Sequence, residues 1–297
     1  MKESTQKLYE ERLLRVLVFI QRNLDEELQL EDLARVAHFS PYHFHRLFRG
    51  MVGESLKEHI RRLRLERAAM RLKHSDQSVL EIALEAGFQT HEAFTRAFRA
   101  LLGCSPSQFR SSNGVISNTP GVHYQNGGDM KATLPHSGGA NMQVKIERLE
   151  PQRVAFVRHV GPYHEVGQAW EKVCARLGKE GLIGPDSRFI GVCHDDPEVT
   201  PPEKIRYDAC VTVDGDFQAE GEVGVQTLPG GEFAVVTHIG PYEKLSQTYA
   251  ALFGQWLPQS GRELRSEPCL EFYLNDPEGT EPEELLTDIY APLEPLS

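Results

Sequence analysis

The chain has 297 residues, of which 40% are hydrophobic and 25% charged, a composition typical of a globular protein with room for two domains. No apolar stretch approaches the roughly 20 residues that cross a bilayer, and the charged N-terminal residues lack the apolar core of a signal peptide. Its five cysteines are scattered without a Cys-x-x-Cys motif. We therefore expect a cytoplasmic protein with reduced thiols, no metal, no cofactor and no membrane partner.

The net charge of −11 is unevenly distributed along the chain. Residues 1–112 carry 18 basic and 15 acidic side chains, whereas residues 113–297 carry 14 basic and 28 acidic ones. A modestly basic half suits nucleic acid, which would repel the acidic half. We expect the two halves to do different work, and one hypothesis is that the acidic half shields the basic half when no ligand is bound.

Residues 8–110 show apolar side chains at helical spacing throughout. The next stretch, 111–142, is rich in Gly, Ser and Asn, as flexible linkers are. From about residue 143, short β-like runs alternate with Gly, Pro and Asp turns and two helical segments. This organisation predicts three parts: an all-α domain at 1–112, a linker at 113–142 and an α+β domain at 143–297.

The helical half contains an internal repeat of 49 to 50 residues. Each copy reads as a helix, a tight turn and a second helix. The first copy predicts helices over 28–37 and 41–50, and the second predicts helices over 79–86 and from about residue 90. The buried and outward positions repeat as well: Phe44 and Phe48 return as Phe94 and Phe98, and Arg46 and Arg49 return as Arg96 and Arg99.

These two units predict a pair of DNA-reading helices. In the first, the apolar pattern leaves Tyr42, His43, His45, Arg46 and Arg49 facing outward. Between the units, a helix over 54–73 carries five arginines and would hold the readers about 34 Å apart, the spacing of successive major-groove faces. The alternative interpretation is a helical bundle with a solvated basic face.

Residues 8–112 closely resemble the DNA-binding domain of the AraC/XylS family. The motifs that carry the resemblance are Ile82-Ala-x-x-Ala-Gly-Phe88, Phe94-x-Arg-x-Phe98 and Gly103-x-Ser-Pro-x-x-Phe-Arg110. The resemblance implies double-stranded DNA as a partner, read in adjacent major grooves, and RNA polymerase as a further partner. Carried over by position, with the flanking arginines added, the candidate DNA contacts are Tyr42, His45, Arg46, Arg49, Arg61, Gln89, Thr90, His91, Glu92, Thr95 and Arg96. The family often has Trp and Gln where Tyr42 and His45 stand here.

The second half contains its own repeat. His159-Val-Gly-Pro-Tyr163 returns 79 residues later as His238-Ile-Gly-Pro-Tyr242, and Trp170 is matched by Tyr249. Gly and Pro suit a turn from strand to helix, so these motifs can be structural elbows. Neither histidine has a second ligand at helical spacing, and no catalytic or nucleotide-binding motif occurs.

Two late strands place acidic and aromatic residues together. Alternation puts Glu271 and Tyr273 on one face of a strand, and Asp288 and Tyr290 on one face of the next. Two carboxylates beside aromatic rings would suit a bulky aromatic cation. The alternative is that these side chains simply face solvent.

Residues 143–297 resemble the GyrI-like effector-binding domain. The matching motifs are the paired His-x-Gly-Pro-Tyr segments, Glu271-x-Tyr-Leu-Asn-Asp276 and Thr287-Asp-Ile-Tyr-x-Pro292. The resemblance implies two βαββ-type halves related by a pseudo-twofold axis, a curved antiparallel sheet with helices on one side, and a groove between the halves. The candidate effector contacts are Tyr163, Trp170, Tyr242, Glu271, Tyr273, Asp288 and Tyr290. Glu271 matches the acidic residue that contacts lipophilic cations in multidrug-binding relatives, whereas the family often has Glu where Asp288 stands.

The combined interpretation is a transcription regulator whose C-terminal groove senses a small effector, with no catalytic residue. Two alternatives stay open: hydrolysis of a small molecule with Glu271 as general base, and binding of a protein partner in the groove.

Overall fold

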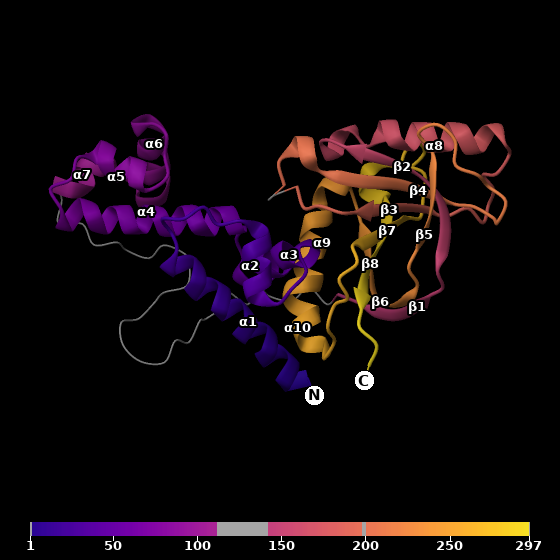
Figure 1. Ribbon diagram of the computed structural model, residues 1–297, viewed down its shortest axis with the longest axis horizontal. Helices are drawn as coiled ribbons and strands as arrows, with labels where there is room; N and C mark the ends of the chain where they lie inside the picture. The colour runs from indigo at the N-terminus through magenta and orange to yellow at the C-terminus, as the bar shows by residue number, and fades with distance from the viewer. Residues whose placement is uncertain (1, 112–141, 198–199, 297) are drawn as a thin grey trace.

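The computed structural model describes residues 2–111, 142–197 and 200–296. Seven helices make up the described N-terminal part: α1 (Lys2–Arg22), α2 (Leu30–Ala37), α3 (Pro41–Val52), α4 (Leu56–His74), α5 (Val79–Glu85), α6 (His91–Leu102) and α7 (Pro106–Ser111). The two predicted helix-turn-helix units are therefore α2–α3 and α5–α6, with α4 running between them (Figure 1). Almost all of the predicted linker, 113–142, lies outside the described residues.

The C-terminal part is an eight-stranded antiparallel sheet with helices on one face. Its strands are β1 (Lys145–Leu149), β2 (Gln152–Val160), β3 (Phe189–Cys193), β4 (Arg206–Thr212), β5 (Gly224–Leu228), β6 (Gly231–Ile239), β7 (Cys269–Tyr273) and β8 (Leu286–Leu293). Two helical segments join strands: α8 (Gly167–Lys179), and a continuous stretch made of α9 (Leu245–Ala251), the π-helix η4 (Leu252–Trp256) and α10 (Leu257–Ser260). Short 3-10 turns complete it: η1 (Tyr163–Glu165), η2 (Pro202–Lys204), η3 (Tyr242–Lys244) and η5 (Pro282–Glu284).

The strand order β1-β6-β8-β7-β3-β4-β2-β5 is symmetric about its centre. Each half contributes a βαββ unit, β2-α8-β3-β4 or β6-α9-β7-β8, and the two meet where β3 pairs with β7. The edge strands are exchanged, because β1 pairs with β6 and β5 pairs with β2. The predicted duplication and pseudo-twofold are confirmed.

One hydrophobic core runs through both parts of the chain. It joins buried side chains of α1–α3 to buried side chains of α9, η4, β6 and β8. Two helix pairs carry the junction: α3 lies against α9 and η4, and α1 lies against α10 (Figure 1). At the second pair, the buried Tyr9 donates its hydroxyl to the carbonyl of Arg262 at 3.3 Å.

The closest approach of the two parts is between backbones. Gly50 of α3 faces Gly254 of η4, and a methyl group added to either residue would overlap the backbone of the other helix. The helix is locally widened at this point, since Leu257 N–H donates to the carbonyl of Leu252, five residues back. Pro258 has no N–H to donate to the Gly254 carbonyl, which favours that widening.

We predict that Gly254→Ala separates α3 from η4. The added methyl group overlaps the Gly50 backbone, and overpacking of this kind costs about 1–3 kcal/mol. Small-angle X-ray scattering should show a larger radius of gyration for this variant. Gly178→Ala in α8 is the matched control, because its methyl group would meet nothing within 4 Å. An unchanged radius for Gly254→Ala would contradict the prediction.

Candidate DNA-reading and effector-binding sites

The second predicted reader, α6, presents its polar side to solvent. Its inner side is buried through Phe94, Ala97 and Phe98. The other side, with the two residues just before the helix, exposes five of the candidate DNA contacts: Gln89, Thr90, His91, Glu92 and Arg96. Thr95 is half-buried, and the Thr90 hydroxyl caps the helix by accepting from Ala93 N–H at 3.1 Å. Arg96 and its neighbours are therefore free to approach a DNA groove.

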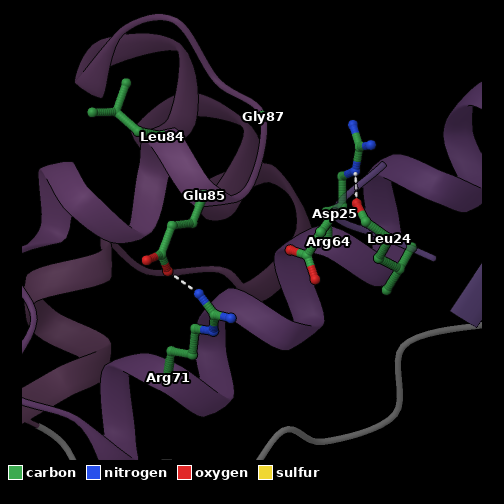
Figure 2. A pocket seen from close by; sticks show the side chains of 7 residues that line it. All are labelled: Leu24, Asp25, Arg64, Arg71, Leu84, Glu85 and Gly87. Carbon is green, nitrogen blue, oxygen red and sulfur yellow. Dashed lines mark hydrogen bonds and ion pairs between the residues drawn. The ribbon is translucent and has the colours of Figure 1, made fainter. Parts of the chain in front are cut away.

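Most arginines of α4 form hydrogen bonds or ion pairs within the helical part of the chain. Arg64 donates to the carbonyls of Leu24 and Glu26 at 2.9 Å, and Arg71 pairs with Glu85 at the end of α5. These side chains line a hollow between the end of α1, α4 and the end of α5, together with Leu24, Asp25, Leu84 and Gly87 (Figure 2). Arg61 differs, since it is exposed with its guanidinium carbon 5.7 Å from the Phe88 ring centre. Of the five arginines of α4, Arg61 is the one that is exposed.

The first predicted reader, α3, does not face solvent. His43, His45 and Arg46 are buried, although the helical pattern placed them outward. The helix presents these side chains to the sheet domain, so the outward face expected from the sequence is here an internal contact. The apolar positions Phe44, Leu47 and Phe48 are buried on the opposite side, as expected.

Each candidate base-reading side chain of α3 contacts the C-terminal part. The Tyr42 hydroxyl lies beside the Arg206 guanidinium, and His45 Nδ1 is 3.0 Å from a carboxylate oxygen of Asp196. The guanidinium carbon of Arg46 lies 4.0 Å from the centre of the Tyr249 ring, a cation–π contact. Arg49 is half-buried. Burial would raise the pKa of Asp196, but the hydrogen bond and charge of His45, followed by the charges of Arg46 and Arg49, lower it.

Tyr249 belongs to a cluster of six aromatic residues around Glu271, where the two halves of the sheet meet. We call it the tyrosine cluster: Tyr163, Trp170, Tyr207, Tyr242, Tyr249 and Tyr273. The buried Glu271 accepts hydrogen bonds from the hydroxyls of Tyr249 and Tyr273, each at 2.8 Å. Within the described part of the chain, no basic side chain forms an ion pair with this carboxylate.

The cluster breaks the pseudo-twofold symmetry at its centre. Glu271 of β7 pairs directly with Gly191 of β3, its counterpart in the other half. A side chain at Gly191 would collide with the ring of Tyr207, which lies across that position. The Tyr207 hydroxyl thereby comes within 2.9 Å of the Tyr273 hydroxyl. The second half of the sheet domain supplies the Glu271 carboxylate, and the first half supplies the Tyr207 ring and the space at Gly191 that the ring fills.

The two His-x-Gly-Pro-Tyr motifs are elbows that aim tyrosines at this cluster. His159 Nε2 donates to the carbonyl of Pro162 at 3.0 Å, and His238 Nε2 donates to that of Pro241 at 3.2 Å. The glycine of each motif, Gly161 or Gly240, has a positive φ of 152° or 128°, a backbone conformation that favours glycine. The next residue after each proline packs on the cluster: Tyr163 on Tyr207 and Tyr242 on Tyr273.

Five of the seven predicted effector contacts lie together and two do not. Tyr163, Trp170, Tyr242, Glu271 and Tyr273 share the helix-covered face of the sheet. Asp288 and Tyr290 pair with Phe272 and Leu270, so they lie on the opposite face. There Asp288 accepts from the Thr237 hydroxyl at 2.6 Å, and the Tyr290 ring packs 4.4 Å from that of Phe272. The predicted pairing of two carboxylates in one site is thus not formed.

Sequence reasoning missed three residues at this site. Tyr207 and Tyr249 belong to the cluster, and Arg46 reaches it from the other half of the chain. Tyr249 had a usable signal, because the repeat aligns it with Trp170. Among the described residues no group of acidic, His and Cys side chains could hold a metal ion, and no described helix is long and apolar enough to span a membrane.

Comparison with known proteins separates the same two parts. A family model described as a GyrI-like small molecule binding domain matches residues 142–294. A second model, a helix-turn-helix domain, matches residues 33–112.

Three relatives illustrate the range of similar proteins. The probable transcriptional regulator YgiV of Escherichia coli is 38% identical over 119 residues, covering 39% of this chain and 74% of YgiV. The HTH-type transcriptional activator AarP of Providencia stuartii is 40% identical over 98 residues, covering 33% and 73%. A DNA gyrase inhibitor of Erwinia billingiae is 29% identical over 157 residues, covering 51% and 97%.

We predict that the contact between α3 and the sheet domain weakens as pH falls below 6.5. Burial, together with the Arg46 charge, lowers the pKa of His43 from 6.5 to about 3, while its Nε2 donates to the carbonyl of Arg265. Below pH 6.5 the separated form takes up a proton that the docked form excludes. Docking therefore loses up to about 1.4 kcal/mol per pH unit between these two values.

The measurement is a pH titration of the radius of gyration of wild type and His43→Gln. The groups around His43 are the Arg46 guanidinium and the carbonyls of Arg265 and Glu267, none of which titrates in this range. The variant should lose the part of the pH dependence that His43 supplies. His91→Gln, on the exposed face of α6, is the control and should titrate as wild type does. Identical titrations for all three proteins would refute the role of His43.

Proposed function

The chain belongs to the GyrI-like small-molecule-binding family and carries an AraC-type helix-turn-helix domain ahead of it, and we propose that its tyrosine cluster binds an aromatic, cationic effector that controls DNA binding. It is a DNA-binding transcription regulator with a small-molecule-binding domain. Of its relatives, YgiV is described as a probable transcriptional regulator and AarP as a transcriptional activator.

The proposal of a cationic effector rests on the burial and the hydrogen-bond partners of the Glu271 carboxylate. Its carboxylate is buried and accepts hydrogen bonds from neutral donors, the hydroxyls of Tyr249 and Tyr273 and the thiol of Cys193. A buried charge that forms no direct ion pair is unfavourable. A flat cation among these rings would supply that counter-charge and stack on the aromatic faces. A neutral ligand of the same shape would gain only the stacking.

The remaining partners follow from the reader helices. We propose that α6, and α3 once it is exposed, read DNA in the major groove, with Arg96 and Arg46 at equivalent positions. RNA polymerase is the second partner that we propose, since AarP is described as a transcriptional activator.

Hydrolysis of the bound molecule is the competing function for the same residues. A general base needs a water molecule within hydrogen-bond reach. Glu271 is buried beneath tyrosine rings, so water has little access to its carboxylate, which favours binding over turnover. Product formation that disappears in Glu271→Gln would establish the enzyme instead.

We predict that Arg96→Ala weakens DNA binding about fivefold or more. Arg96 is exposed on α6, where it can contact a base edge or a phosphate, and such a contact is worth about 1–3 kcal/mol. Fluorescence anisotropy with a DNA site selected by the full chain measures the effect. Arg148→Ala removes one exposed positive charge from the far edge strand and should leave affinity unchanged. Equal losses in both variants would show that only net charge matters.

We predict that the protein prefers N-methylacridinium to neutral acridine at pH 8, and that Glu271→Gln removes the preference. The Glu271 charge should be worth at least about 1.4 kcal/mol, a tenfold change in Kd. Isothermal titration calorimetry of the full chain measures both ligands. Asp288→Asn, which removes a carboxylate from the opposite face of the sheet, is the control. A cation preference that survives Glu271→Gln would contradict the assignment.

A further inference from the structure

We propose that Arg46 is an internal ligand of the tyrosine cluster: its guanidinium occupies the face of Tyr249 that a cationic effector uses, so effector binding and the docked position of α3 exclude each other. The inference rests on the proposed function, because it assumes that the cluster binds a cation. On this basis the cation displaces Arg46 from Tyr249, and the displacement releases α3.

Arg46 is held as a bound cation would be. Its side chain is buried, with 8% of the residue exposed. The guanidinium carbon sits 4.0 Å from the centre of the Tyr249 ring, and Nη1 has no hydrogen-bond partner although it is shielded from solvent. A guanidinium that served only to anchor a helix would be expected to pair with a carboxylate. This one rests on a ring face, which is the geometry of cation recognition.

Tyr249 links Arg46 to Glu271. Its ring face carries the Arg46 cation, while its hydroxyl donates to the Glu271 carboxylate. Arg46 also acts on the first half of the sheet domain: burial and Cys193 raise the pKa of Tyr163, the Arg46 charge lowers it, and Glu271 raises it again. Arg46 and Glu271 are therefore the positive and negative charges of one site. An effector cation stacked on Tyr249 would replace the Arg46 charge.

The docked position of α3 is fixed on both sides of Arg46. On one side His43 donates to the carbonyl of Arg265, and Asp196 lies 3.0 Å from His45. On the other, Gly50 touches the backbone of Gly254. These contacts hold α3 in one register on η4, and in that register Arg46 lies on the Tyr249 ring. The acidic loop at Asp196 accepts the basic side chains that would otherwise meet DNA phosphates.

Docking removes the DNA-reading face of α3. Tyr42, His45 and Arg46 are the candidate base contacts, and all three lie against the sheet domain. A recognition helix must insert this face into the major groove to read bases. The docked form therefore has one reader, α6, and the released form has two. By linkage, an effector that binds only the released form raises DNA affinity by the factor by which DNA raises effector affinity.

The test compares wild type, Gly254→Ala, Arg46→Gln and Gly178→Ala as full chains. Gly254→Ala releases α3 but keeps Arg46, Tyr249 and Glu271. Arg46→Gln removes the internal cation and is used only for ligand binding, since Arg46 is itself a candidate DNA contact. Gly178→Ala is the control, because its methyl group meets nothing within 4 Å. The probes are N-methylacridinium and a DNA site selected with Gly254→Ala.

Competition predicts a specific pattern. Gly254→Ala and Arg46→Gln should each bind N-methylacridinium about tenfold more tightly than wild type and Gly178→Ala do, because the competing cation is gone. Saturating N-methylacridinium should raise the DNA affinity of wild type about tenfold. It should leave Gly254→Ala unchanged, because that variant binds DNA tightly without the dye.

Two failures are distinguishable. If N-methylacridinium binds all four proteins equally well and does not change their DNA affinity, the proposed competition is wrong while the cation-binding function stands. If it binds none of them, including Gly254→Ala, the proposed function itself is wrong. In that case, equal DNA affinities of wild type and Gly254→Ala would also overturn the masking of α3.

Discussion

The contact on which the rest of the arrangement depends is the crossing of α3 and η4 at Gly50 and Gly254. Two backbones can approach this closely only where neither residue has a side chain, and the π-helical widening of η4 lies at the same point. The crossing brings α3 within reach of the tyrosine cluster, so Arg46 can extend onto the Tyr249 ring. Together with the contact of α1 with α10, it joins the two parts of the chain in one hydrophobic core.

The binding chemistry arises where the duplication is imperfect. The repeated elements build the scaffold: the two elbows, the covering helices and the paired central strands. At the centre, Gly191 and Glu271 are repeat partners with opposite properties, one leaving space and the other supplying charge. A symmetric pair of carboxylates there would repel each other at close range. The asymmetry therefore gives a single acidic position surrounded by rings from both halves.

Local patterns predicted the elements, their faces and the duplication correctly, because helical spacing and strand alternation depend on neighbouring residues. They failed for α3, whose outward face is covered by residues about 150 to 220 positions later in the chain. A polar, basic helix face has the same pattern whether it meets solvent, phosphates or a tyrosine ring. Alternation also placed Asp288 and Tyr290 together correctly, but it could not say which face of β8 points at Glu271. The pairing register decides that, and it turns them away.

Masking one reader rather than both has a physical consequence for regulation. The exposed side of α6 stays available in the docked form, so a chain with α3 hidden can still meet DNA through half of its contacts. Non-specific binding depends on phosphate contacts and needs few of them, whereas specific binding needs base contacts from both readers. Release of α3 would therefore raise specificity more than it raises overall affinity. In this arrangement Arg46 supplies either a contact to the tyrosine cluster or a contact to DNA, and the ligand that takes its place on Tyr249 decides which.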